Sequence, residues 1–284
     1  MRHTLRYAAN CSLLFTELPL LQRAAAARGA GFDAVEFWWP WPHQPVPPDA
    51  EADAFIGSVR DAGVTLVGLN FFAGDLAGPD CGVLSIPARS REFQDNVDVA
   101  VAIGAALGAT GFNALYGNRV DDVDAAEQDE VAIANLGLAA DKAATIGATV
   151  LLEPVSGPKP YPLRTAADVV DVLDRVQAAG ADNVGLLLDL FHLANNGDDV
   201  TKAIDTYAGR VAHVQVADHP GRHEPGTGQL DLDGHLGRLE ATAYDGWVAL
   251  EYNPAGSTVD SLGWLPRERR GSAEDNLQAR RSTR

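Results

Sequence analysis

The sequence predicts a single (β/α)8 barrel, an α/β fold in which eight parallel strands alternate with helices. Seven times, a glycine that can end a helix is followed within a few residues by a strand-favouring stretch, and an opening strand near residues 5–10 makes eight. Glycine tolerates the left-handed turn after a helix, so this repeat is typical of αβ connections. Strict alternation with helices implies parallel strands, which close into a barrel when there are eight. The repeats fall at 28–37, 61–70, 107–115, 146–153, 179–186, 208–214 and 245–250.

The helices are predicted from apolar residues three or four positions apart and from capping residues at their starts. In the first helix, Thr16 is the expected cap, and Leu18, Leu21 and Ala25 share a face. The fifth opens with a capping box formed by Thr165 and Asp168. The others are expected to start at 49 and 90 and to cover 125–146, 199–207 and 232–242.

The barrel is expected to occupy residues 1–265 as one domain. The remaining segment, 266–284, carries six arginines against three acidic residues and little apolar content, so it is predicted to be a disordered tail. A doubly wound open sheet is the main alternative fold. No GxGxxG motif follows the first strand, which removes the most recognisable form of that alternative.

Charge and cysteine content exclude several classes of function. The formal net charge of −17 argues against a nucleic-acid partner, because phosphate neutralisation requires clustered lysine and arginine. Cys11 and Cys81 are the only cysteines and form no CxxC pair, so neither a disulfide framework nor a thiolate metal site is indicated. The N-terminus lacks the apolar stretch of a secretion signal, and no apolar run approaches 18 residues. The sequence therefore predicts a cytoplasmic protein without a membrane partner.

Four of the predicted strands end in a side chain that offers oxygen: Glu153, Asp189, Gln215 and Glu251. In a parallel barrel, such strand ends converge at the C-terminal mouth. Three carboxylates close together would repel one another and take up protons unless a cation lay among them. Because all four donors are oxygen, the site is expected to hold one Mg²⁺ or Mn²⁺ ion rather than Zn²⁺.

Three further residues near these strand ends suit an anionic, oxygen-rich substrate. Asn70 ends the third strand, His192 follows Asp189 by three residues, and Arg222 lies beyond Gln215. Arginine can bind a carboxylate through two hydrogen bonds, and histidine can donate to a hydroxyl.

Other polar residues near the strand ends are expected to have structural roles. They are Glu36 at the end of the second strand, which could instead face the mouth, His213 as a core histidine, and Asp218, which would orient a neighbour or cap a loop. Long loops follow four strands, at 38–48, 71–89, 155–163 and 217–229, and loops of this length usually line or cover a site. The Trp- and Pro-rich loop at 38–48 could instead form a subunit contact, which leaves a homo-oligomer open.

These segments resemble the hydroxypyruvate isomerase family, within the xylose-isomerase-like barrels that also include ketose 3-epimerases and metal-dependent endonucleases. The similarity spans residues 7–264 and rests on segments 8–15, 31–37, 73–75, 86–89, 152–154, 189–192, 213–218, 222–228 and 244–252. Gln215 together with segment 222–228 separates this family from the epimerases, which place histidine at the third ligand. The loop 155–161 differs from that of hydroxypyruvate isomerases and looks more like that of 2-oxo-tetronate isomerases.

The resemblance implies that Glu153, Asp189, Gln215 and Glu251 bind one divalent metal and that Glu153 and Glu251 form the acid/base pair. His192 and Arg222 would contact the substrate. The expected activity is isomerisation of a small oxo-acid through an enediolate, with hydroxypyruvate to 2-hydroxy-3-oxopropanoate first and 2-oxo-tetronate isomerisation or a ketose 3-epimerase-like reaction as alternatives. From other classes, a non-catalytic binding barrel and a metal-dependent endonuclease also remain open.

Overall fold

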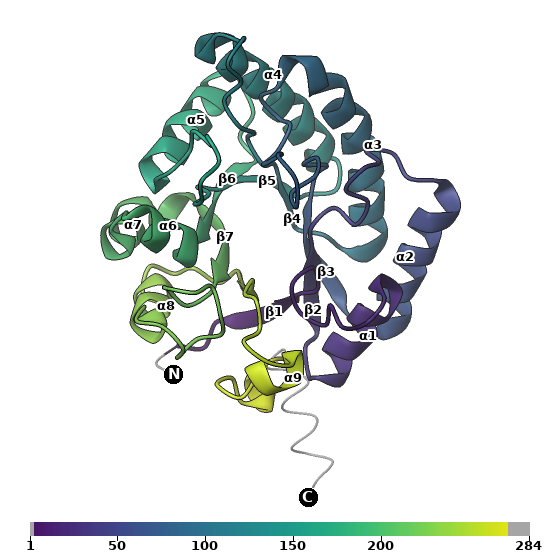
Figure 1. Ribbon diagram of the computed structural model, residues 1–284, viewed down its shortest axis with the longest axis vertical. Helices are drawn as coiled ribbons and strands as arrows, with labels where there is room; N and C mark the ends of the chain where they lie inside the picture. Colours follow the sequence, from purple (N-terminus) through teal and green to yellow (C-terminus); the bar gives the residue numbers. More distant parts are fainter. Residues whose placement is uncertain (1–2, 272–284) are drawn as a thin grey trace, which may run out of the picture.

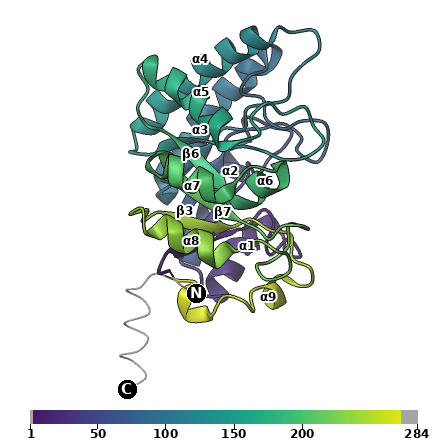
Figure 2. The ribbon, with the colours of Figure 1, turned by 90° about the vertical axis from the view of Figure 1, so that its left-hand side faces the viewer.

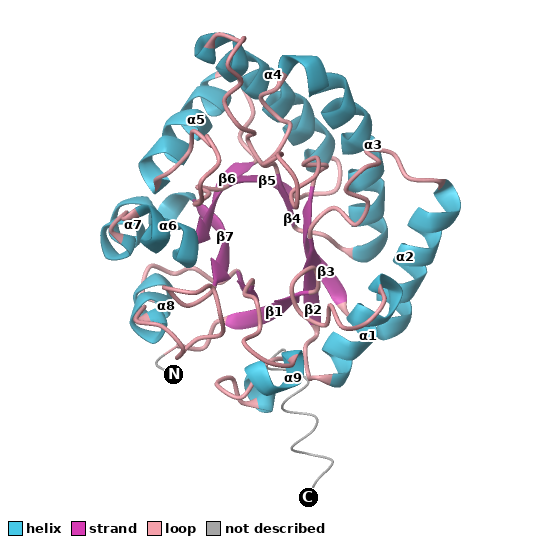
Figure 3. Ribbon diagram, in the orientation of Figure 1, coloured by secondary structure: helices cyan, strands magenta, loops and turns pink. Residues whose placement is uncertain are grey.

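Eight parallel strands close into a barrel in the computed structural model, which describes residues 3–271 (Figures 1 and 3). Each strand pairs with the next along the chain, and the last returns to pair with the first. The strands are β1 (Arg6–Asn10), β2 (Ala34–Phe37), β3 (Thr65–Asn70), β4 (Gly111–Asn113), β5 (Thr149–Leu152), β6 (Val184–Asp189), β7 (Val211–Val216) and β8 (Trp247–Leu250). The predicted fold class is confirmed.

Helices surround the ring of strands, as Figure 3 shows in cyan, and Figure 2 shows the same layers from the side. The α-helices are α1 (Leu20–Gly29), α2 (Asp49–Ala62), α3 (Ser90–Leu107), α4 (Ala125–Ala144), α5 (Ala166–Ala178), α6 (Leu190–Asn196), α7 (Val200–Tyr207), α8 (Leu232–Glu240) and α9 (Thr258–Ser261). Three short 3-10 turns complete the set: η1 (Pro87–Arg89), η2 (Ala208–Arg210) and η3 (Arg267–Arg269).

The prediction for the first helix was wrong in its start and in its buried face. Helix α1 begins at Leu20, after Pro19, and Thr16 does not cap it. Proline lacks a backbone N–H and has a fixed φ, so it is tolerated at the start of a helix but not inside one. The side chains turned inward are Ala24 and Ala27, whereas Leu21 is 46% exposed.

The remaining helix starts follow the predicted signals closely. The α5 capping box is present, because Thr165 accepts from the Asp168 backbone N–H and the Asp168 side chain accepts from the Thr165 N–H. Helices α6 and α9 were not predicted. The Asp189 carboxylate accepts a hydrogen bond from the His192 N–H in the first turn of α6, so this helix begins directly at the end of β6.

The hydrophobic core consists of two clusters of unequal size. The larger one lies between the strands and the helices, and a small separate cluster consists of Ala8, Ala34, Val67 and Ala249. Because side chains alternate along a strand, Ala8, Ala34 and Ala249 share a face with the residues two positions further on. Those residues are Asn10, Glu36 and Glu251, so the polar mouth of the barrel lies above a floor of small side chains.

The Trp/Pro loop at 38–48 is largely part of the core. The indole rings of Trp39 and Trp41 contact each other, and Trp41 also contacts Phe55 of α2. The Trp39 Nε1 donates to the Gln44 carbonyl at 2.8 Å within the loop. Asn96 Nδ2 of α3 donates to the Pro45 carbonyl at 2.8 Å, which holds the loop against its own barrel. Only Trp38 of the three tryptophans reaches the cavity at the barrel mouth.

The first residues of the predicted tail pack on the barrel. Residues 266–271 include η3, and the Arg270 guanidinium donates to the carbonyls of Leu262, Leu265 and Ala30. This part of the chain therefore packs on the barrel, and the rest of the predicted tail, 272–284, lies outside the described residues. Within residues 3–271, none of the helices has the length and apolar character needed to cross a membrane.

Candidate active site

The predicted site residues meet at a cavity of about 190 Å³ at the C-terminal mouth of the barrel. Five of the seven predicted residues line it: Asn70, Glu153, His192, Arg222 and Glu251. Asp189 and Gln215 lie directly beside it. Ligand atoms of Glu153, Asp189 and His192 are all within 4.8 Å of one another, and the Gln215 amide donates to Glu251. The structure thus brings together all seven residues that the sequence singled out.

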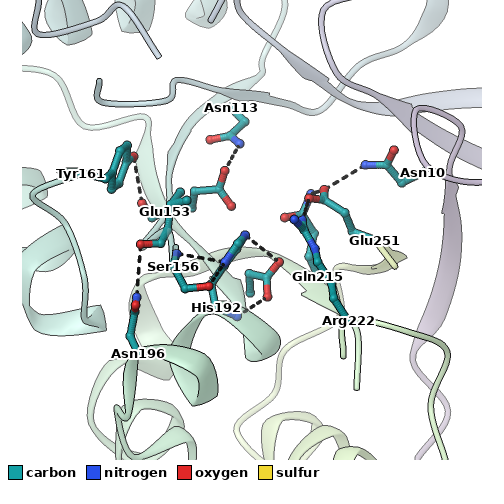
Figure 4. A network of polar contacts seen from close by, with 12 residues as sticks. Asn10, Asn113, Glu153, Ser156, Tyr161, His192, Asn196, Gln215, Arg222 and Glu251 are labelled. Carbon is teal, nitrogen blue, oxygen red and sulfur yellow. Dashed lines mark hydrogen bonds and ion pairs between the residues drawn. The ribbon is translucent and has the colours of Figure 1, made fainter. Parts of the chain in front are cut away.

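Glu153 is buried at the end of β5 and is held by one neighbouring amide. The Asn113 Nδ2, at the end of β4, donates to Glu153 Oε1 at 2.8 Å (Figure 4). Burial is the main cause that raises the pKa of Glu153 to about 8, and the nearby charge of Asp189 raises it further. The carboxyl group can therefore gain and lose a proton near neutral pH.

Glu251 lies on the other side of the site, where it has three partners (Figure 4). Arg222 donates to Glu251 Oε1 at 2.7 Å, while Asn10 Nδ2, at 2.9 Å, and the Gln215 amide donate to Oε2. Burial raises the pKa of Glu251 well above its ordinary value, although the Arg222 charge acts in the opposite direction.

Asp189 carries the third carboxylate and is fully buried. Burial raises its pKa to about 6, against the opposing effects of the Arg222 charge and the backbone hydrogen bonds in the first turn of α6. Three carboxyl groups with raised pKa values around one cavity indicate a site that a cation would stabilise.

His192 presents a proton donor to this site. The Ser156 backbone N–H can only donate, and it lies 3.0 Å from His192 Nδ1, so that nitrogen is the acceptor. Burial holds the pKa of His192 well below its usual value, so the ring is neutral and its proton is on Nε2. The Nε2 lies 3.9 Å from Asp189 Oδ2. A protonated Nε2 is a poor metal ligand and a good donor to a substrate oxygen, which favours the predicted substrate contact.

Three oxygens of the predicted ligand set are buried without a partner. Glu153 Oε2, Asp189 Oδ2 and Gln215 Oε1 accept no hydrogen bond from the part of the chain that is described. Buried acceptors of this kind are rare unless water or an ion satisfies them. Carboxylate and amide oxygens are the ligands that Mg²⁺ and Mn²⁺ prefer, so these residues fit a hard divalent cation.

Arg222 is held over the cavity by its loop. Its backbone adopts a left-handed conformation with φ of 59°, and its N–H donates to the Asp218 carbonyl at 3.0 Å. The guanidinium carbon lies 5.5 Å from the centre of the Phe191 ring. Its Nε is buried and has no hydrogen-bond partner within residues 3–271, and the side chain lines the cavity.

The expectation that Asp218 caps a loop is confirmed, and His213 is a buried, hydrogen-bonded histidine as expected. Asp218 caps its loop by accepting from the backbone N–H groups of His219, Gly226 and Leu230. His213 and Glu36 are both buried and form a pair with 2.7 Å between Nε2 and Oε2.

Sequence reasoning missed the amides that hold the two glutamates. Asn10 and Asn113 end β1 and β4 in the same way as the predicted ligands end their strands, so an amide at a strand end was a signal that could have found them. It also missed Lys159, which donates to the carbonyls of Leu76 and Asp80 at 3.1 and 2.5 Å and joins the loops after β3 and β5 over the cavity.

The raised pKa of Glu153 predicts how stability depends on pH after chelator treatment. When the pKa of a carboxyl group is higher in the folded state than in the unfolded state, the group stabilises the fold at pH values below its unfolded-state pKa. This contribution is lost as the pH rises toward the folded-state pKa of about 8. Between about pH 5 and 8, the free energy of unfolding should fall more steeply in the wild type than in Glu153→Gln, by roughly 1 kcal/mol per pH unit. Urea titrations in EDTA at several pH values in this range measure the free energy of unfolding of both proteins. Equal slopes of this free energy against pH would contradict the prediction.

The sequence profile of the xylose isomerase-like TIM barrel family matches residues 24–268. A Streptomyces coelicolor protein, provisionally named a hydroxypyruvate isomerase, is 52% identical over 92% of this chain and 95% of its own length. The Pectobacterium atrosepticum 2-oxo-tetronate isomerase is 32% identical over 91% of this chain and 96% of its own length. The Escherichia coli hydroxypyruvate isomerase is 30% identical over 92% of this chain and 98% of its own length.

A solved structure also superposes closely. The crystal structure of a Brucella melitensis protein named AP endonuclease, family 2, matches with a TM-score of 0.83 and 36% identity, over 92% of this chain and 98% of its own.

Proposed function

The chain belongs to the hydroxypyruvate isomerase family of xylose isomerase-like TIM barrels, and on that basis we propose that it is a metal-dependent oxo-acid isomerase. Its proposed reaction converts hydroxypyruvate to 2-hydroxy-3-oxopropanoate. The observation that carries the proposal is the pair Glu153 and Glu251, two buried carboxyl groups with raised pKa values that line the same cavity.

Glu153, Asp189, Gln215 and Glu251 would hold the metal, Mg²⁺ or Mn²⁺. Three of the four offer a buried oxygen that has no partner within the described residues, which supports this set. When bound, the ion supplies positive charge that stabilises the enediolate and makes the substrate C–H more acidic.

The side chains carry out the proton transfers. One glutamate removes a proton from C3 of hydroxypyruvate, and the other delivers a proton to C2. The proton of the C3 hydroxyl passes to the C2 oxygen, so that carbonyl and hydroxyl exchange places. Arg222, which lines the cavity, binds the substrate carboxylate through its guanidinium. The His192 Nε2–H donates to a substrate oxygen and stabilises the charge that develops there. Asn70 is a further substrate contact on the cavity wall.

2-Oxo-tetronate is the second candidate substrate. It carries the same carboxylate and the same pair of reacting carbons, and the identity to the Pectobacterium enzyme supports it. The loop at 155–161, which contributes Ser156 and Lys159 to the cavity, differs from the form expected of hydroxypyruvate isomerases. A ketose lacks the carboxylate that Arg222 is proposed to bind.

A nucleic-acid substrate is opposed by the charge of the chain. The Brucella protein is named an endonuclease, yet a net charge of −17 on this chain would repel a phosphate backbone. A barrel without catalysis is opposed by the site itself, because buried carboxyl groups are unfavourable unless they serve a function. We therefore expect a small oxo-acid, not nucleic acid, as the partner.

Proton NMR in D₂O tests the activity directly. Incubated with Mg²⁺ or Mn²⁺, the enzyme is expected to introduce deuterium at the carbons that lose and gain the proton in hydroxypyruvate or 2-oxo-tetronate, and EDTA should abolish the exchange. The oxo-acid that exchanges faster identifies the substrate. Absence of exchange in every oxo-acid and ketose with either metal would reject the isomerase.

A further inference from the structure

Glu36 is the centre of a buried hydrogen-bond network that the proposed reaction does not use. Its carboxylate is 3% exposed. Oε1 accepts from Asn10 Nδ2 and from Gln215 Nε2, both at 2.8 Å, and Oε2 lies 2.7 Å from His213 Nε2. Glu36 is not part of the cavity lining, so it does not contact the substrate.

The backbone is adapted to place this side chain. The register between β2 and β3 shifts between Val35 and Glu36, and the register between β6 and β7 shifts just before His213. Such irregularities re-aim side chains. On β3, a Cβ added at Gly68 would lie 3.1 Å from Glu36 Oε2, so glycine leaves the space that the carboxylate fills.

The network determines how the Gln215 amide is oriented. Its nitrogen lies against carboxylate oxygens of both Glu36 and Glu251, and so does the nitrogen of Asn10. Each amide therefore donates one N–H to each glutamate. Turning the Gln215 amide over would place its oxygen against two carboxylates, which is electrostatically unfavourable.

A consequence is that Gln215 Oε1 points away from both glutamates. This oxygen is buried and accepts no hydrogen bond within residues 3–271. We infer that Glu36 is a positioning residue that fixes the Gln215 amide so that its oxygen, not its nitrogen, is presented to the proposed metal. The inference rests on the proposed function, which needs Gln215 as an oxygen ligand.

Two substitutions at position 36 separate this role from a merely structural one. Glu36→Gln keeps an oxygen that can accept from Gln215 and Asn10, and the new amide nitrogen can donate to His213 Nε2. Glu36→Met has a similar length but no acceptor oxygen of this kind. Isothermal titration of Mn²⁺ without substrate should show affinity about 10–100-fold weaker for Glu36→Met, the usual effect of losing a group that orients a ligand, and near wild type for Glu36→Gln.

Two further proteins control for loss of stability. Glu36→Met combined with His213→Leu replaces the buried pair by apolar side chains, which is often well tolerated, while the acceptor for Gln215 is still missing. Leu136→Ala removes a fully buried side chain on α4, away from the cavity. The double variant should bind Mn²⁺ as weakly as Glu36→Met, and Leu136→Ala should bind it like the wild type.

The outcomes distinguish the inference from the function on which it rests. If the wild type binds Mn²⁺ and the folded Glu36→Met or double variant binds it equally well, the positioning role is wrong and the metal site stands. If Glu36→Gln is as weak as Glu36→Met, the charge rather than the acceptor geometry matters, and the inference is also wrong. If the wild type binds no Mn²⁺, the metal-dependent function fails together with the inference.

Discussion

Replacing Glu153 with glutamine is expected to lower kcat about 10²–10⁴-fold, the usual contribution of a positioned acid or base. The amide has nearly the same shape, so the Asn113 contact and the packing of the site can persist. The fold should be retained, because glutamine removes a buried carboxyl group whose ionised form is unfavourable. Steady-state rates with hydroxypyruvate and thermal melts of the same preparation measure both effects.

A carboxylate outside the site provides the matched control. Glu92 on α3 pairs with Arg89 at the surface, and Glu92→Gln should change kcat little. The proton-transfer assignment would be withdrawn if Glu153→Gln retained activity within about tenfold of the wild type, less than one acid or base group normally contributes.

Replacing Arg222 with methionine is expected to lower kcat/KM at least about 30-fold, mainly through KM. Removing one partner of a buried charge pair costs roughly 2–5 kcal/mol, and here both the substrate carboxylate and Glu251 lose a partner. Arg222→Lys keeps the charge but loses the planar pair of donors, so it should fall between the wild type and Arg222→Met. Initial rates across substrate concentration give the two constants separately.

An analogue without the carboxylate identifies the group that Arg222 binds. In the wild type, kcat/KM should be higher for the oxo-acid than for the analogue. In Arg222→Met this ratio should fall toward one, because the arginine contact favours the acid alone. An equal loss for both compounds would mean that Arg222 acts through Glu251 and not on the substrate carboxylate.

The barrel could be predicted from sequence because its signals are local and repeated. Glycine at helix ends, apolar strands and capping residues each act within a few positions, and the Thr165 capping box formed as expected. The start and the buried face of the first helix were predicted wrongly, because Pro19 sets its start and small alanines, not leucines, face inward. Helix α6 was missed because Asp189 ends β6 and caps α6 at once, a dual role that no periodic pattern shows.

The placement of the site residues followed from topology, whereas their interactions did not. Parallel strands must deliver Glu153, Asp189 and Glu251 to one mouth, so the cluster could be expected. Which amide holds which oxygen depends on neighbours 26 to 241 positions apart, such as Asn10 with Glu36 and with Glu251. The tautomer of His192 likewise depends on Ser156, which lies 36 positions away. Pairings of this kind leave no pattern in one sequence.

The double use of the Gln215 amide constrains how this enzyme could evolve. A histidine that bound the proposed ion through one ring nitrogen would have only one N–H left, whereas the glutamine supplies one to Glu36 and another to Glu251. A lineage that exchanged glutamine for histidine in a single step would leave one buried carboxylate short of a donor. We therefore expect such an exchange to be accompanied by mutations at positions 10 or 36, on the two neighbouring strands.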